Sequence, residues 1–164
     1  PPPNGPFGTP PAFTPSSDFL ISNRTMQTIS LLAVLASVAA ACEWGWEEYK
    51  GSCYRLQSRT NTWTIHNFEC VYEGGTLASI KSEGENEFIR RLAHGRDVYI
   101  GGASFGYSWE WADHSSFYGY SNWADESESY PPRGKPCISM NSYGQWEAHC
   151  CANPPRAAVC VRRW

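Results

Sequence analysis

The stretch GGTLASIKSEGENEFI, residues 74–89, contains the end of one predicted helix and the start of the next. Its paired glycines end the first helical pattern, because glycine readily adopts the left-handed backbone that follows the last turn of a helix. Ser82 and, three residues later, Glu85 form a capping box, in which two side chains satisfy free backbone N–H groups at a helix start. The stretch therefore predicts two successive helices with a short connection between them.

The second helix is indicated by an apolar stripe as well as by its cap. Phe88, Ile89 and Leu92 recur at helical spacing, and Gly95 ends the pattern. Gly84 in the first turn weakens this helix by about 1 kcal/mol relative to alanine. We expect the stripe to be buried in the core.

Upstream of this stretch the sequence predicts another helix and a hairpin. A threonine precedes Trp63 as a cap, and a helix over about 63–73 would place Trp63 and Cys70 on one apolar face. Before it, aromatic and polar residues alternate around Lys50-Gly51, as is typical of a short hairpin. Two flanking cysteines could staple that hairpin.

Short runs rich in β-branched and aromatic residues predict strands in the second half of the chain: VYIGG, WEWAD, CISM, GQWEA and AAVCV. Between Trp111 and Cys137 the chain is rich in Gly, Ser, Pro, Tyr and acidic residues, with little periodicity. A long irregular segment inside a compact domain is usually functional, so we expect a ligand there. Aromatic residues crowd beside this loop and are expected either to pack or to contact a ligand: Tyr107, Phe117, Tyr118, Tyr120 and Tyr130.

Composition narrows the classes of function. A chain of 164 residues is long enough for one globular core and short for two. The net charge of −3 provides no basic surface, so nucleic acid is not an expected partner. The histidines fall in different predicted elements, and no nucleophile–base pair stands out, so we do not expect an enzyme. These histidines are His66, His94, His114 and His149.

The N-terminal part of the chain has the composition of segments outside the folded domain. Residues 26–41, MQTISLLAVLASVAAA, are apolar and end in small residues, which is typical of a secretory signal peptide. The apolar run is shorter than the roughly 18 residues that span a bilayer, so no membrane anchor is expected in the mature form. The proline-rich residues 1–25 predict a disordered or artefactual leader, with natural synthesis starting at Met26. Residues 42–164 would then form one secreted, extracellular domain.

All seven cysteines follow the predicted signal peptide, so disulfides are the first expectation. Their number leaves one cysteine over, and sequence arithmetic alone does not choose the pairs. A zinc site is not expected, because the paired C-x-x-C spacing is absent. A nucleophile built from His149 and Cys150 is not expected either, because neighbours in a strand point to opposite faces.

Taken in order, several motifs closely resemble the C-type lectin-like domain: GSCY, TW, GGTLASIKSEGENEFI, VYIGG, WEWAD, YSNW, CISM, GQW and AVC. The resemblance covers residues 42–161 and implies an α+β fold with two helices, small antiparallel sheets and a long loop. It places four tryptophans in the core: Trp109, Trp111, Trp123 and Trp146. It also implies a non-enzymatic recognition module that binds a glycan or glycoprotein surface. The alternative is calcium-independent binding of a protein ligand by the same domain.

The resemblance also implies a disulfide framework. The family pattern pairs Cys70 with Cys160 and Cys42 with Cys53. It places the partner of Cys137 five residues after Trp146, at Cys151. Cys150 is then unpaired, and a lone thiol in a secreted protein indicates either an intermolecular bridge, which would give a Cys150-linked dimer, or a buried or capped monomer thiol.

Sugar-binding members of this family hold calcium with side-chain oxygens, and calcium takes several such ligands. The positions that supply them fall here on Ser127, Glu128, Ser129, Lys135, Glu147 and Ala148. Only Glu147 keeps a strong oxygen ligand, and the Lys135 ammonium would repel a divalent ion. No metal or other cofactor is therefore expected. Calcium is the alternative, held by a shifted cluster of carboxylates: Asp125, Glu126, Glu128 and Glu147. These four residues and Tyr130 are the candidate ligand contacts.

Overall fold

The structure, a computed structural model of the chain, describes residues 42–104 and 106–163. The leader expected over residues 1–25 and the signal peptide expected over 26–41 lie outside these residues, so both remain sequence predictions. In the described part of the chain, no helix has the length and apolar character needed to cross a membrane.

The described domain begins with the predicted hairpin. Strands β1 (Glu47–Tyr49) and β2 (Ser52–Asn61) pair antiparallel. Lys50 and Gly51 between them both have positive φ, 48° and 75°, which is the backbone of a tight two-residue hairpin turn. The turn residues thus confirm the prediction made from the alternating pattern.

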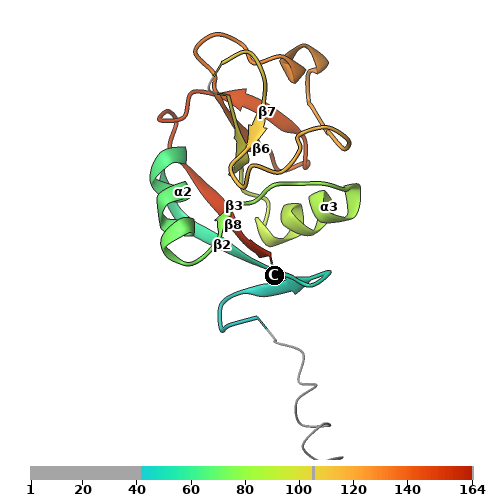
Figure 1. The fold of residues 1–164 in the computed structure, drawn as a ribbon. Helices are drawn as coiled ribbons and strands as arrows, with labels where there is room; N and C mark the ends of the chain where they lie inside the picture. Colours follow the sequence, from blue (N-terminus) through green and yellow to red (C-terminus); the bar gives the residue numbers. More distant parts are fainter. Residues whose placement is uncertain (1–41, 105, 164) are drawn as a thin grey trace, which may run out of the picture. The chain divides into compact units, whose positions relative to one another are not determined.

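Strand β8 (Arg156–Arg163) organises the half of the domain next to the hairpin. It pairs antiparallel with β2 and with the two-residue β3 (Thr76–Leu77). Helices α2 (Trp63–Tyr72) and α3 (Glu83–Leu92) lie on opposite sides of these strands (Figure 1). Both predicted helices are confirmed, whereas β3 was not anticipated because two residues carry no period.

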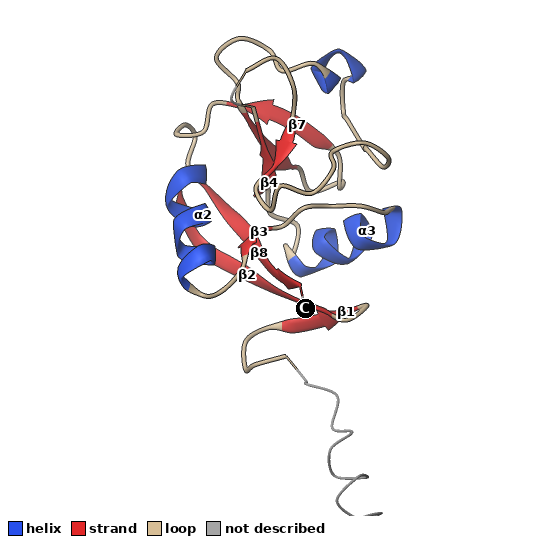
Figure 2. Ribbon diagram, viewed as in Figure 1, coloured by secondary structure: helices blue, strands red, loops and turns tan. Residues whose placement is uncertain are grey.

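The other half of the domain is a set of short strands that supports the long loop. Strand β4 (Val98–Ala103) pairs parallel with β8 and antiparallel with β5 (Glu110–Trp111) and β6 (Cys137–Met140). Strand β7 (Trp146–His149) pairs antiparallel with β6 at the edge. The small antiparallel sheets expected from the resemblance are therefore joined, through the parallel β4–β8 pair, into one mixed sheet (Figure 2).

The helix caps form, but the predicted capping box forms only in part. The Thr62 hydroxyl accepts from Ile65 N, and the Ser82 hydroxyl accepts from Glu85 N at 3.3 Å. The Glu85 carboxylate does not return to the backbone of Ser82; it accepts from Lys81 N at 2.7 Å and pairs with Arg163 at 2.6 Å. Because Glu85 is buried, its carboxylate needs charged and hydrogen-bonding partners within the protein, and Lys81 N and Arg163 supply them.

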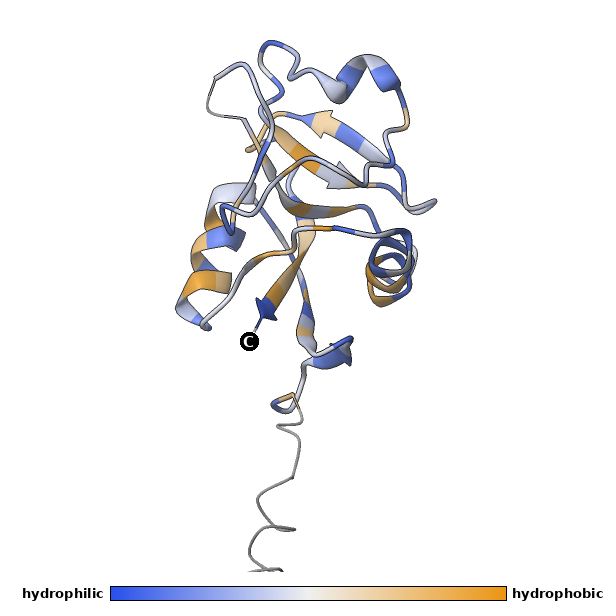
Figure 3. Cartoon of the chain, turned by 45° about the vertical axis from the view of Figure 1, so that its right-hand side comes forward, coloured by the Kyte–Doolittle hydropathy of each residue, from blue (hydrophilic) through white to orange (hydrophobic). Residues whose placement is uncertain are grey.

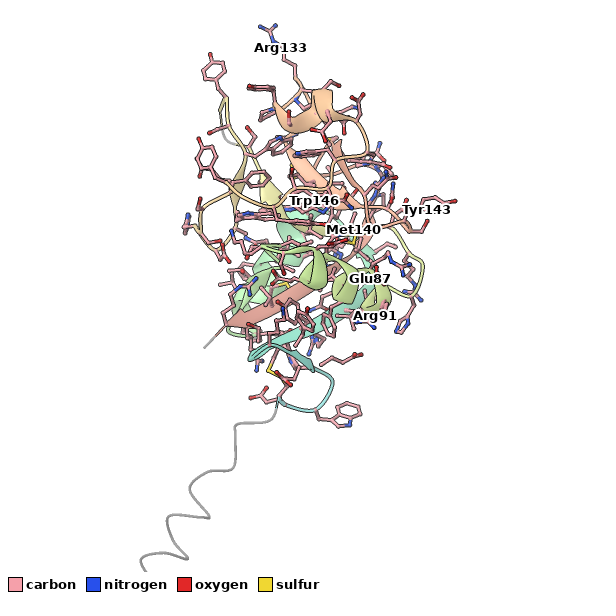
Figure 4. All side chains as sticks on the ribbon, turned by 90° about the vertical axis from the view of Figure 1, so that its right-hand side faces the viewer. Glu87, Arg91, Arg133, Met140, Tyr143 and Trp146 are labelled. Atoms are coloured by element: carbon pink, nitrogen blue, oxygen red, sulfur yellow. A yellow bond between two sulfur atoms is a disulfide. The ribbon has the colours of Figure 1, made fainter. Side chains whose placement is uncertain are left out.

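The buried core consists of two clusters: an aromatic-rich one that packs on α3, and a second one that includes Trp63 and Cys70 of α2. The four tryptophans assigned to the core from the resemblance are all buried: Trp109, Trp111, Trp123 and Trp146. Trp146 and Met140 lie inside the domain in Figure 4, and apolar residues concentrate along the inner strands in Figure 3. On α3, Ile89 and Leu92 are buried as expected, but Phe88 is only partly buried and stacks on Tyr49 at 4.8 Å.

Candidate functional site

The long loop after β5 lies at the end of the domain away from the β1–β2 hairpin (Figure 2). It contains one regular element, the 3₁₀ turn η1 (Glu126–Ser129), which Asp125 caps by accepting from Ser127 N at 2.9 Å. Backbone bonds hold the loop to β7: Trp146 N donates to Asn122 O at 2.7 Å, and Ala124 N donates to Trp146 O at 2.9 Å. The loop is thus irregular but firmly attached.

The carboxylate of Glu128 is engaged by protein groups on both oxygens. One oxygen accepts from Ala148 N at 2.7 Å, and the other lies 3.4 Å from the Lys135 ammonium. The Trp109 indole N–H also donates to Glu128 O at 2.8 Å, which fixes the backbone. Positions that the resemblance associates with a calcium ion therefore meet in space, but a lysine ammonium stands among them.

Glu147 has separate partners on β7 and the β6–β7 turn. Its oxygens lie 2.8 Å from Asn141 Nδ2 and 3.2 Å from His149 Nε2. Burial opposes ionisation of Glu147, but the hydrogen bonds from Asn141 and His149 outweigh burial and lower its pKa. Asp125, which is exposed, also has a lowered pKa because Ser127 N donates to it. Both groups therefore carry a negative charge at neutral pH.

The structure does not gather the four candidate carboxylates into one cluster. Asp125 and Glu126 are exposed, whereas Glu128 and Glu147 each face their own partners. Within residues 42–104 and 106–163, no group of three or more His, Cys, Asp and Glu side chains is placed to hold a metal ion. Tyr130, the fifth candidate, is exposed directly after η1.

A hollow of about 650 Å³ opens beside η1 and is lined by residues from 107–110, 114–121, 123 and 129–131. We call it the aromatic hollow. The aromatic residues predicted beside the loop all line it, but they have two environments. Phe117 and Tyr120 are partly buried and pack on the core, whereas Tyr107, Tyr118 and Tyr130 are exposed. The sequence predicted these rings as a group but not the serines between them, although residues 104–121 are rich in tyrosine, serine and glycine.

The three disulfides join the pairs expected from the resemblance: Cys42–Cys53, Cys70–Cys160 and Cys137–Cys151. Cys150 is free and exposed. Of the histidines, His66 is buried and its Nε2 lies 2.9 Å from Arg156 O, so it is part of the packing of α2. The His149 Nε2 atom lies between Glu147 and Arg156.

Known proteins share this chain's sequence pattern and its fold. The model of the family described as Lectin C-type domain matches residues 59–162. The lactose-binding lectin l-2 of Anguilla japonica is 35% identical over 96 residues, which are 56% of this chain and 58% of that protein. This chain thus spans a little over half the length of the Anguilla lectin.

Solved structures agree with the sequence comparison. A calcium-independent type II antifreeze protein has a TM-score of 0.66 and 26% identity, over 75% of this chain and 95% of its own. The carbohydrate-recognition domain of cow CD23, in the presence of a GlcNAc2Man3 oligosaccharide, has a TM-score of 0.69 and 25% identity, over 76% of this chain and 97% of its own. Related domains thus include one with a sugar and one described as independent of calcium. With its fold, its disulfides and its family match in agreement, the chain belongs to the Lectin C-type domain family, whose members are binding modules.

Proposed function

We propose that this chain is a secreted, non-enzymatic recognition module that binds carbohydrate at its long-loop end without requiring calcium. Family membership and the lactose-binding relative support carbohydrate as the ligand. The observation that carries calcium independence is the bonding of Glu128, whose carboxylate is occupied by Lys135 and Ala148 N. A divalent ion at this position would displace those partners and face the Lys135 ammonium.

The proposed contacts with the ligand are the acidic residues of the loop and the neighbouring tyrosine: Asp125, Glu126, Glu128, Tyr130 and Glu147. A carboxylate can accept hydrogen bonds directly from sugar hydroxyls, with no metal between them. Asp125 and Glu147, like other carboxyl groups, are ionised at neutral pH, and their lowered pKa values extend this charge to more acidic solutions. Tyr130, exposed beside η1, would supply an aromatic face.

A glycan array with and without a chelator tests this function. We expect the purified protein to bind the same glycans in EDTA as in millimolar calcium, while a calcium-dependent lectin run in parallel loses its signal in EDTA. Isothermal titration of the protein with calcium alone should show no binding heat. Loss of glycan binding in EDTA, or calcium binding near micromolar strength, would overturn the calcium-independent mechanism.

The second candidate function is recognition of a protein surface by the same domain. It is favoured by Tyr107, Tyr118 and Tyr130, which stand exposed in a segment rich in tyrosine, serine and glycine. This composition is typical of antibody paratopes, in which rigid aromatic side chains provide contact area at low entropic cost. A glycoprotein that binds the domain separates the two functions: binding that survives enzymatic deglycosylation would identify the protein surface as the ligand.

A further inference from the structure

We propose that the aromatic hollow is a saccharide-binding subsite distinct from the loop carboxylates, and that it selects neutral rather than anionic sugars. This inference rests on the proposed carbohydrate binding and names the place and the class of ligand. Ser129, Tyr130 and Pro131, at the end of η1 and just after it, line the hollow. The Glu128 carboxylate instead contacts Ala148 N and the Lys135 ammonium.

The size of the hollow favours a small ligand. Its volume of about 650 Å³ lies within the roughly 300–1,000 Å³ that is usual for small-molecule sites. A protein partner in a typical interface instead needs a surface of about 800 Å² on each side. A concave site of this volume therefore fits one end of an oligosaccharide better than the flat face of a protein.

The rim of the hollow carries aromatic rings that the protein itself leaves uncovered. Tyr107, Tyr118 and Tyr130 are exposed by 99%, 94% and 80%. All three line the same hollow, although they come from separate parts of the chain. A concentration of exposed aromatic surface marks a binding site, because removing the rings from water under a ligand is favourable and stabilises the complex. The apolar faces of sugar rings are suited to stack on such rings.

The interior side of the hollow is rigid. Phe117 stacks on Trp111 with ring centroids 4.7 Å apart, and it also lies 6.5 Å from Trp109. Trp109 is fixed in turn by the hydrogen bond from its indole N–H to Glu128 O. Because these rings are held by the core, little conformational freedom is lost when a ligand binds against them.

The polar groups of the hollow match a neutral, hydroxyl-rich ligand. Serine hydroxyls line it at five positions: Ser108, Ser115, Ser116, Ser121 and Ser129. The hydroxyls of Ser115 and Ser129 donate to Asp113 and to Glu126 O, so toward a ligand these two act as acceptors. None of the described residues that line it is a lysine or an arginine, and the acidic Glu110 is among them. The ammonium of nearby Lys81 is bonded to Ser116 O and lies over the Trp111 ring, 5.1 Å from its centroid. Apart from the imidazole of His114, the described lining residues include no group that can carry a positive charge. A sialylated or sulfated sugar would thus meet no lysine or arginine and would face the Glu110 carboxylate.

The test combines a glycan array with tyrosine variants. The array should carry neutral glycans together with their sialylated and sulfated forms, and the best neutral glycan is then titrated calorimetrically. We expect Tyr107→Ala and Tyr118→Ala each to weaken binding about tenfold, the effect of losing one stacked ring and the area it buries. Tyr143→Ala is the matched control, because Tyr143 is 82% exposed, projects outward from the β6–β7 turn (Figure 4) and is not among the residues that line the hollow.

The outcomes separate the subsite from the general function. Unchanged affinity in both Tyr107→Ala and Tyr118→Ala would overturn the subsite but leave carbohydrate binding by the domain intact. A preference for sialylated or sulfated glycans would overturn the predicted neutrality. No glycan binding by the unaltered protein would overturn the proposed function and the subsite with it. Near-UV circular dichroism of each variant should match the unaltered protein, since both tyrosines are exposed.

Discussion

At the scale of single residues, Glu85 shows how a side chain in the first turn of a helix can also hold separate strands together. Its carboxylate accepts from Tyr54 Oη and Lys81 N and pairs with Arg163 near the end of β8. Burial and the adjacent Glu85 raise the pKa of Tyr54, so the phenol stays protonated and donates to the carboxylate. One buried charge thus connects β2, α3 and β8.

Removing this charge should be costly, whereas removing its neighbour on the same helix should not. Glu85→Ala leaves Arg163 and Tyr54 without their common partner, so we expect a loss of about 2–4 kcal/mol in the free energy of unfolding. Glu87→Ala is the control, because Glu87 pairs only with Arg90 on the helix surface and should leave stability unchanged. Urea unfolding of both variants measures the difference, and equal stabilities would contradict this role of Glu85.

Asp113 makes a related prediction for acid stability. Burial opposes its ionisation, but hydrogen bonds from Ser115 and Ser79 outweigh burial and hold its pKa below the ordinary value of 3.8. The unfolded chain therefore binds a proton at Asp113 more tightly than the folded protein does. The contribution of Asp113 to the free energy of unfolding is complete above about pH 4, and it is lost as the pH falls through the lower pKa of the folded state. Asp113→Asn should flatten the dependence of the unfolding free energy on pH in this window, measured by urea titration at several pH values. An unchanged slope would show that Asp113 does not contribute.

At the scale of elements, the sequence predicted what is encoded locally. The caps of α2 and α3, the hairpin turn and the strands with β-branched or aromatic residues were all recognisable, because each depends on a few adjacent residues. Strand β3 and the turn η1 were not, because β3 exists through pairing with β8 and η1 is held by tertiary bonds to β7. For the same reason the sequence predicted the aromatic rings of the hollow but not its concave shape or its serines, since the hollow combines residues 107–110 and 114–121 with residues 129–131.

The close approach of β3 to β4 predicts a position where only glycine fits. A Cβ atom on Gly101 would lie 2.5 Å from Leu77 O, which is backbone and cannot turn away. We expect Gly101→Ala to destabilise the domain by about 1–3 kcal/mol, the usual cost of overpacking, measured by urea unfolding. Gly106→Ala is the control, because its Cβ would have no neighbour within 4 Å. Similar stability for the two variants would argue against this packing of β3 on β4.

At the scale of the whole domain, the disulfides tie distant parts of the chain together, and the two adjacent cysteines have opposite roles. Cys151 is bonded to Cys137 and its carbonyl accepts from Trp63 N at 2.8 Å, which connects the long loop to the start of α2. Cys150 is exposed and free. The resemblance, rather than cysteine arithmetic, distinguished the two in advance, because local sequence does not show which neighbour faces inward.

Substitution should separate these roles. Cys150→Ser should leave the melting temperature unchanged, because an exposed thiol without a bond contributes little to stability. Joint replacement of Cys137 and Cys151 by serine should lower the unfolding free energy by about 3 kcal/mol, the entropic value of a loop of this length. The pair is replaced jointly so that Cys150 cannot take the place of Cys151.

Non-reducing electrophoresis of the native protein tests the state of Cys150. A covalent dimer that disappears in Cys150→Ser would assign Cys150 to an intermolecular bridge. A monomer in both proteins would leave Cys150 as a capped or free surface thiol.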